Sequence, residues 1–238
     1  MKKKVLAVGL CGAMILSLIG CGGGSSDSNT AKETKTTETV KETIASTEEV
    51  ALIESGYSVT ENSAGVYIYY GIKLENKSQE KSAFLPTVTI TAKSEDGSII
   101  TTEDQTLMNI APGDTVTYGF QIDSKGTVPA TVEFSVSDSK FVDPDDETIV
   151  LSQLPVSNTS EVAGDFNISY TGEVENTSAT DIDTGAATVL LRKDGAIVYG
   201  MTGFVNDLTA GSKKPFEIKT YGDLPEHDSF EISVQPWL

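Results

Sequence analysis

The sequence has very few residues of the types on which covalent cross-linking and catalysis depend. Its 238 residues include only two cysteines, Cys11 and Cys21, both near the N-terminus. The rest of the chain therefore has no disulfide and no thiol nucleophile, so packing alone must hold its folded units together. A zinc site needs several His or Cys ligands, and the single histidine, His227, cannot provide them. We expect His227 to lie solvated in a surface loop.

Sequence motifs for enzymatic chemistry are also missing. The chain contains no Gly-x-Ser-x-Gly elbow and no Gly-x-x-x-x-Gly-Lys-Ser/Thr phosphate-binding loop. Carboxylates are plentiful, but a glycosidase needs two of them at a defined separation within a cleft. We therefore predict that the protein is not an enzyme and carries no cofactor.

Basic residues are scarce as well. The chain has 17 Lys and Arg residues against 35 Asp and Glu residues, which gives a formal net charge of −18. Such a surface repels nucleic acid and anionic lipid, so we expect no nucleic-acid partner. The acidity fits either recruitment of cations or basic partners, or plain solubility outside the cell.

The N-terminal residues have the layout of a secretory signal, in which three lysines precede the apolar run Val5–Leu18. This run is too short to span a bilayer comfortably. Leu18-Ile19-Gly20-Cys21 resembles the lipobox of bacterial lipoproteins. The resemblance implies that residues 1–20 are removed and that Cys21 becomes diacylated; the alternative is an uncleaved segment with an incidental cysteine. Two acyl chains anchor durably, which predicts a cell-membrane lipoprotein facing outside the cytoplasm.

Residues 21–49 follow the leader and are dominated by Gly, Ser, Thr, Lys and Glu. A segment with so few large apolar residues cannot offset the entropy of ordering the chain. We therefore expect a disordered spacer, whose root-mean-square span as a flexible coil would be about 30 Å.

A duplicated pattern occupies the remainder of the chain. The run Tyr70–Ser78 recurs as Tyr170–Ser178, and each copy is followed by an Asp-Gly pair, first Asp96-Gly97 and then Asp194-Gly195. Alternating apolar residues and turn signals at short intervals are typical of antiparallel sandwiches. We predict an all-β fold of two tandem immunoglobulin-like antiparallel β-sandwiches, with modules at residues 50–142 and 143–238.

The second module also resembles a known family. Gly172–Ser178, Val189–Gly195, Leu208–Gly211 and Pro215-Phe216 are similar to the corresponding segments of the FxLYD family of small extracytoplasmic bacterial domains. The first module matches more loosely. The resemblance implies an immunoglobulin-like sandwich with no known active site, of a type often carried by lipoproteins.

Two tyrosines suggest a candidate binding patch. Tyr67 and Tyr69 lie opposite the aliphatic face of their predicted strand, whereas the second copy has Asn167 and Ser169 there. Outward aromatic rings could contact a sugar chain or a protein, because they offer large contact area at low entropy cost. The alternative is that they pack on cross-strand neighbours or under a loop.

The acidic junction between the modules and the single tryptophan offer two weaker candidates. Asp143, Asp145 and Asp146 could supply oxygen ligands to Ca²⁺, although no EF-hand pattern is present and an ordinary solvated linker would look the same. Trp237 either fills the bottom of the second sandwich or recognises a ligand.

These features support two functions. The first is a surface-anchored lipoprotein that acts as a non-catalytic binding or scaffolding module of the cell envelope, with a protein or glycan partner. The second is a structural spacer or accessory subunit without a specific ligand. A soluble-ligand receptor is less well supported, because such receptors are usually larger two-lobed α/β proteins.

Overall fold

The structure is a computed structural model that describes residues 49–145, 148–164, 167–220 and 223–237. Within these residues nearly all of the regular secondary structure is β-strand, and no helix is long and apolar enough to cross a bilayer. The strands are β1 (Val50–Asn62), β2 (Gly65–Asn76), β3 (Ser82–Phe84), β4 (Thr87–Lys93), β5 (Ile99–Thr106), β6 (Thr115–Asp123), β7 (Thr131–Val136), β8 (Lys140–Val142), β9 (Val156–Ala163), β10 (Ile168–Glu175), β11 (Ile182–Lys193), β12 (Ala196–Leu208), β13 (Lys213–Lys219) and β14 (Ser229–Trp237), with a short 3-10 helix at Leu151–Gln153.

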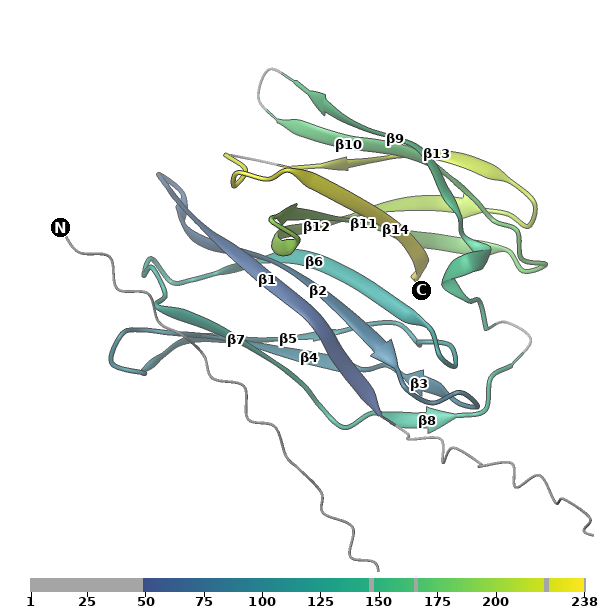
Figure 1. The fold of residues 1–238 in the computed structure, drawn as a ribbon, viewed down its shortest axis with the longest axis horizontal. Helices are drawn as coiled ribbons and strands as arrows, with labels where there is room; N and C mark the ends of the chain where they lie inside the picture. Colours follow the sequence, from purple (N-terminus) through teal and green to yellow (C-terminus); the bar gives the residue numbers. More distant parts are fainter. Residues whose placement is uncertain (1–48, 146–147, 165–166, 221–222, 238) are drawn as a thin grey trace, which may run out of the picture. The chain divides into compact units, whose positions relative to one another are not determined.

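The strands form two sandwiches of the same topology. In the first sandwich, sheet β1-β2-β6 faces sheet β5-β4-β7, and β3 pairs with β8 at one end. In the second, sheet β9-β10-β13 faces sheet β12-β11-β14. Every strand pair is antiparallel, and the predicted all-β sandwich fold is confirmed (Figure 1).

Period-two alternation explains how each sheet forms its half of a core. On β4, Val88, Ile90 and Ala92 are fully buried, while the threonines between them remain partly exposed. The Asp-Gly hairpin signal in the second sandwich also forms as expected. Asp194 and Gly195 both have positive φ, at 51° and 82°, which suits the tight turn between β11 and β12.

The duplicated asparagine at the end of the repeated run has a structural role. Asn76 is fully buried, and its Nδ2 donates to the carbonyl oxygens of Lys81, Ile110 and Ala111 at 2.8, 2.9 and 3.1 Å. The equivalent Asn176 donates to two carbonyl oxygens. Buried polar groups need such partners, so the repeat marks a turn fastened to a neighbouring loop.

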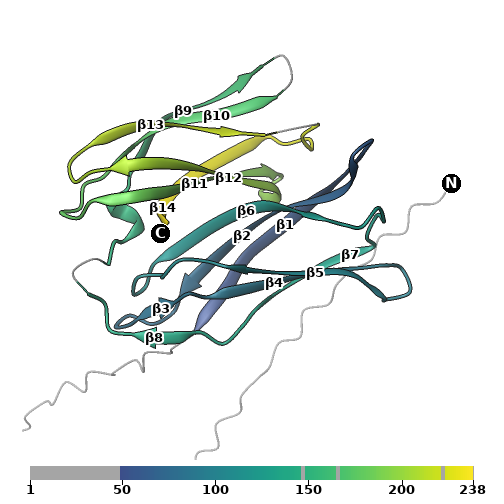
Figure 2. The same cartoon turned by 180° about the vertical axis from the view of Figure 1, so that it is seen from behind.

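The two sandwiches pack against each other through sheets that are not equivalent. Strand β12 contacts β1, β2 and β6, so sheet β12-β11-β14 of the second sandwich lies on sheet β1-β2-β6 of the first. Figures 1 and 2 show the four sheets as successive layers from opposite sides. The contact is therefore front to back, and each sandwich has one outer sheet face that the other sandwich does not cover.

A row of glycines permits this close approach. Gly56, Gly71 and Gly119 are cross-strand partners on β1, β2 and β6. Gly200 of β12 lies against this row, and a Cβ atom placed on it would be 2.6 Å from the Tyr70 carbonyl oxygen and 2.7 Å from the Gly71 Cα atom. Only glycine leaves enough room for backbone to lie on backbone here.

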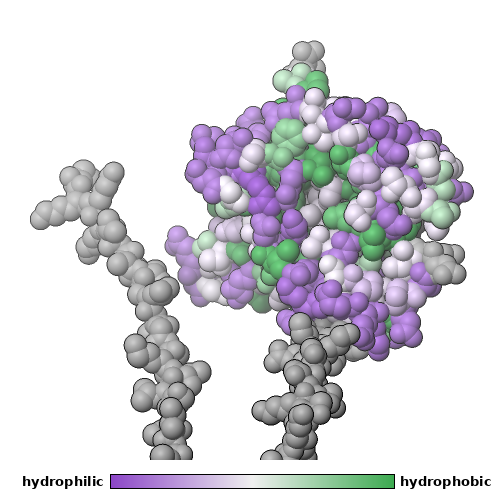
Figure 3. All heavy atoms as spheres, turned by 45° about the vertical axis from the view of Figure 1, so that its right-hand side comes forward, coloured by the Kyte–Doolittle hydropathy of each residue, from purple (hydrophilic) through white to green (hydrophobic). Residues whose placement is uncertain are grey.

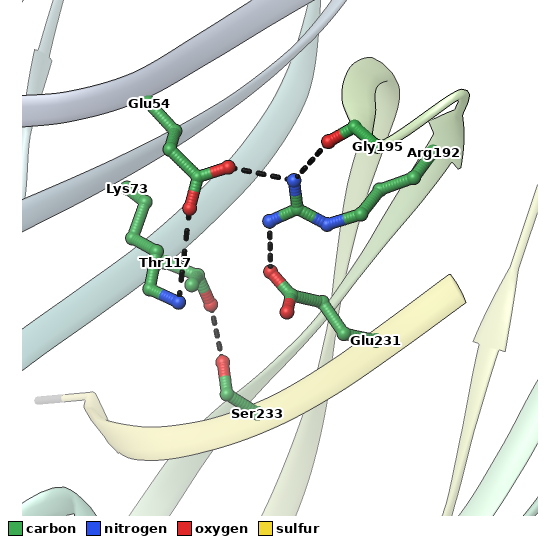
Figure 4. A network of polar contacts seen from close by, with 7 residues as sticks. All are labelled: Glu54, Lys73, Thr117, Arg192, Gly195, Glu231 and Ser233. Carbon is green, nitrogen blue, oxygen red and sulfur yellow. Dashed lines mark hydrogen bonds and ion pairs between the residues drawn. The ribbon is translucent and has the colours of Figure 1, made fainter. Parts of the chain in front are cut away.

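Polar groups complete the contact between the sandwiches. The single arginine of the chain, Arg192, donates from Nη1 to Glu54 at 2.6 Å and from Nη2 to Glu231 at 2.8 Å, and so joins β1 to β14 (Figure 4). These hydrogen bonds, of which that to Glu54 contributes most, raise the pKa of Arg192. Nearby, the hydroxyl groups of Thr117 and Ser233 are also hydrogen-bonded to each other.

Candidate binding groove

The first sandwich is open along one side, where its edge strands β5 and β6 lie. In the second sandwich the equivalent edge strands, β12 and β13, pack against each other and close that side. In the first sandwich a groove with a volume of about 290 Å³, open to solvent, separates β5 from β6. We take this groove as the candidate site, because ligand sites are usually concave.

Two side chains account for the difference. On β5, Glu103 is the cross-strand partner of the buried Ile90; at the corresponding place on β12, Met201 pairs with the buried Val189. Met201 is buried in its core, whereas Glu103 is exposed. A carboxylate is costly to bury, so the chain at Glu103 stays at the solvent boundary and the two sheets do not close.

The partner strand differs in the same way. Tyr70 pairs with Phe120 of β6, and the matching Tyr170 pairs with Ile218 of β13. Ile218 is fully buried, but the Phe120 ring is 43 % exposed at the edge of the groove. At this position the second sandwich therefore has a buried core residue, whereas the first sandwich has a partly exposed aromatic ring.

The floor of the groove contains a buried tyrosine with an unused hydroxyl group. Tyr70 is 1 % exposed and lines the groove beside Ile90 and Ile122. Among the hydrogen bonds of the described residues, the Tyr70 hydroxyl makes none. Burial raises the pKa of Tyr70 above its usual range, and the neighbouring Tyr118 and Glu103 add to this effect. The hydroxyl therefore stays protonated and remains a hydrogen-bond donor at neutral pH.

The rim of the groove is acidic. Glu103, Asp104 and Asp123 line it, together with the amides of Gln105 and Gln121. Asp104 accepts a hydrogen bond of 2.6 Å from Thr89, and Asp123 forms an ion pair of 3.2 Å with Lys125. In the part of the chain that the structure describes, the Glu103 carboxylate has neither a hydrogen bond nor an ion pair.

An aromatic strip extends the groove toward the second sandwich; it consists of Phe120, Tyr118, Trp237 and Phe204. The Tyr118 ring lies 6.5 Å from Phe120 and is stacked at 5.7 Å on Trp237, which in turn lies 5.8 Å from Phe204. Phe204 is 51 % exposed. On the face drawn in Figure 3, hydrophobic patches likewise lie between hydrophilic surroundings.

The predicted tyrosine patch is wrong. Tyr69 is only 6 % exposed and is stacked on Tyr199 of the second sandwich, with ring centroids 5.0 Å apart. Tyr67 is partly buried and packs against the same hydrophobic cluster. Both rings lie on the face of β2 that the second sandwich covers, so the alternative, that they pack internally, describes them better.

Of the other candidate ligand residues, the structure describes Asp143 and Asp145. The Asp145 side chain and the Thr148 hydroxyl form a local hydrogen bond of 2.9 Å, and no acidic cluster suited to a metal ion occurs in the described ranges. Asp143 is exposed. Asp146 and the predicted lipidation site Cys21 lie outside the described residues, so the calcium and lipid predictions stay predictions.

Trp237 and His227 are both placed differently from expectation. Trp237 packs against the core cluster of the first sandwich rather than filling the bottom of the second. The His227 side chain is 16 % exposed, not solvated, and its Nε2 atom lies 3.0 Å from Glu161 Oε2 and 3.3 Å from the Tyr170 hydroxyl. Sequence reasoning could not detect either contact, because each partner is distant along the chain.

Sequence reasoning also missed Glu103 and Phe120, although a signal for them existed. Aligning the two copies places Glu103 where the second copy has Met201, and Phe120 where it has Ile218. Taken together, the fold and the groove define an all-β protein of two antiparallel sandwiches with a candidate ligand site on the first. Comparison with family models and with curated proteins gave no match for the chain.

Proposed function

We propose that the protein is a non-catalytic binding module of the bacterial cell envelope, anchored to the membrane by lipid on Cys21 and facing outside the cytoplasm. The observation that carries the binding role is the open groove between β5 and β6, at a position where the second sandwich is closed by Met201 and Ile218. An open edge leaves apolar surface and the unpartnered hydroxyl group of Tyr70 facing a solvent-filled groove, which a purely structural spacer would not require.

The membrane attachment rests on the lipobox resemblance and on the position of the sandwiches in the sequence. Residues 21–49 form the connection between Cys21 and β1, and their composition suits a flexible tether. Mass spectrometry of the N-terminal peptide tests this part independently of binding. A diacylated Cys21 is expected, and a peptide that retains residues 1–20 would contradict it.

Site-specific photo-crosslinking on intact cells tests the binding role. A photoreactive amino acid replaces Gln121 on the rim of the groove in one variant. In a matched control it replaces Lys219, which occupies the corresponding register position on β13 opposite Ser169. We expect a specific crosslinked product from position 121 that is absent from position 219 and is lost when Glu103→Gln is added.

The second candidate function is a spacer or accessory subunit without a specific ligand. The contact between the two sandwiches favours it, because the glycine row and Arg192 hold the two sandwiches together in one compact unit. Identical crosslinking at positions 121 and 219, or none at either, would support the spacer and contradict the binding role.

A further inference from the structure

We propose that the groove of the first sandwich binds an extended, basic peptide segment of a partner protein, with a lysine or arginine side chain inserted between β5 and β6. This inference rests on the proposed binding function and names its ligand class. It is argued from the charge of the groove, from the unused polar groups inside it and from the free edge of β6.

The charge of the groove selects a cation. Three carboxylates line it, from Glu103, Asp104 and Asp123, and the only cation that pairs with any of them in the described residues is Lys125. The formal net charge of the whole chain is −18, which adds long-range attraction for a basic partner. Because Glu103 has no internal partner, an incoming ammonium or guanidinium group gains an ion pair without breaking one.

The shape of the groove suits the stem of such a side chain. Ile90 and Ile122 provide apolar walls, and the half-exposed Phe120 ring lies at the mouth. Lysine and arginine have aliphatic stems that pack on apolar surface, and their charged groups interact favourably with aromatic rings. The Tyr70 hydroxyl at the floor can donate to a backbone carbonyl of the bound segment, since its pKa keeps it protonated.

The edge of β6 suits an extended backbone. Among the strands that the structure describes, β6 pairs only with β2, so about half of its backbone groups need partners elsewhere. The second sandwich supplies some of them, since the amides of Thr117 and Gly119 donate to Gln235 and Thr202 at 3.3 Å. Backbone groups alternate in direction along an antiparallel strand, so the N–H and C=O groups of Gln121 point away from β2, as those of Thr117 and Gly119 do. They can therefore pair with an added strand.

Calorimetric titration of the full chain in detergent micelles tests the ligand class. One probe is a capped octapeptide of alternating lysine and valine; the others are its glutamate counterpart, cellohexaose and chitohexaose. We expect binding of the lysine peptide alone. Glu103→Gln should weaken it about tenfold, because a hydrogen-bonded charge is lost.

Two matched variants separate a specific site from general attraction to an acidic protein. Glu133→Gln removes the same charge from the outer face of the same sandwich, where Glu133 pairs with Lys93, and should change affinity less than twofold. Tyr70→Phe removes only the unused hydroxyl group and should weaken binding about fivefold while leaving the melting temperature unchanged.

Each contrary outcome overturns a defined part of the inference. Equal weakening by Glu103→Gln and Glu133→Gln would mean nonspecific charge attraction, with Glu103 serving only to protect a sheet edge from pairing. Binding of a glycan but not of the lysine peptide would show that the ligand class is wrong. If no probe binds while position 121 still crosslinks on cells, the peptide proposal fails and the binding function stands; if both fail, neither stands.

Discussion

The two sandwiches share their architecture but differ in the residues of the sheet face that, in the first sandwich, contacts the second. Both retain the buried asparagine of the repeated run and the same order of strands in each sheet. The row Gly56, Gly71 and Gly119 of the first sandwich corresponds to Ser160, Thr171 and Glu217 of the second. Side chains therefore cover the face of the second sandwich that glycines leave bare on the first.

This difference means that the outer sheet face of the second sandwich lacks the glycine surface that takes part in the front-to-back contact. A front-to-back contact can in principle continue with further copies, because it leaves one unused face at each end. At one end, the face built around Thr171 carries side chains at the positions where the first sandwich has the glycines that let Gly200 approach Gly71. The buried asparagine and the order of strands are thus common to both copies, whereas residues on the sheet faces and edges differ.

The largest expected effect on stability comes from adding a side chain at Gly200, which lies against the glycine row. Gly200→Val should destabilise the protein by about 3 kcal/mol or more, since the added carbons would overlap the backbone of β2. Chemical denaturation followed by tryptophan fluorescence measures this change, because Trp237 stacks on Tyr118 across the contact.

A substitution at the corresponding row of the second sandwich is the control. Ser160→Ala lies on an exposed, uncovered face and should change stability by less than about 0.5 kcal/mol. Equal effects of Gly200→Val and Ser160→Ala would contradict the assignment of the glycine row as the contact surface.

Replacing either of the shared asparagines should lower the stability of the protein substantially, and by a similar amount in the two sandwiches. Asn76→Ala and Asn176→Ala each leave buried carbonyl groups without a donor, and each should cost about 2 to 3 kcal/mol. Asn76 donates to three carbonyl oxygens and Asn176 to two, so the first variant should be the less stable. Thermal unfolding of the two variants compares them directly, and a neutral result for either would show that its loop is held by other contacts.

A smaller effect is expected from the ion pairs at a matched position. Arg192 with Glu231 and Lys93 with Glu133 occupy the same register in the two sandwiches, but only Arg192 also contacts Glu54 of the other sandwich. Arg192→Met should cost about 1 to 2 kcal/mol, because it leaves two carboxylates unpaired at a partly buried contact.

The exposed pair gives the comparison for that variant. Lys93→Met should cost less than about 1 kcal/mol, since surface ion pairs contribute little. Urea denaturation at low and high salt distinguishes the two. If the variants lost equal stability, Arg192 would not be joining the sandwiches.

The smallest effect concerns pH and only the second sandwich. Desolvation lowers the pKa of His227, but hydrogen bonds and the charge of Glu161 outweigh it and raise the pKa above the ordinary 6.5. The hydrogen bond with His227 holds the pKa of Glu161 below its ordinary 4.5, against partial burial. The stabilisation from His227 is complete below pH 6.5 and is lost as pH rises through its folded pKa, while that from Glu161 is lost as pH falls below 4.5.

The pair should therefore contribute most between about pH 4.5 and 6.5, by less than about 1 kcal/mol because both groups are partly exposed. His227→Gln should flatten the dependence of the melting temperature on pH across this window. The first sandwich has no counterpart, because His227 is the single histidine of the chain and it lies beside Tyr170 of the second sandwich. An unchanged pH profile would show that the pair is not formed in solution.

The fold was predictable from local patterns, whereas the groove was not. The alternation of apolar residues on β4 predicts a strand, and the Asp194-Gly195 pair predicts a hairpin turn. Both signals depend only on residues that are neighbours in the sequence. The difference between Tyr69 and Ser169 was visible in the sequence, but it marks the contact between sandwiches and not a binding patch. Sequence pattern shows that two copies differ at a position, without showing which surface covers that position.

The sequence by itself determined the class of fold, the duplication and the turns, because strand pleating and turn chemistry are set by residues close together in the chain. The tertiary structure alone decided that Gly71 meets Gly200, that Arg192 reaches Glu54, and that Glu103 and Phe120 border an open groove. These partners are far apart in the sequence. Their meeting depends on how the sheets stack, and packing geometry of that kind is fixed only when the whole chain has folded.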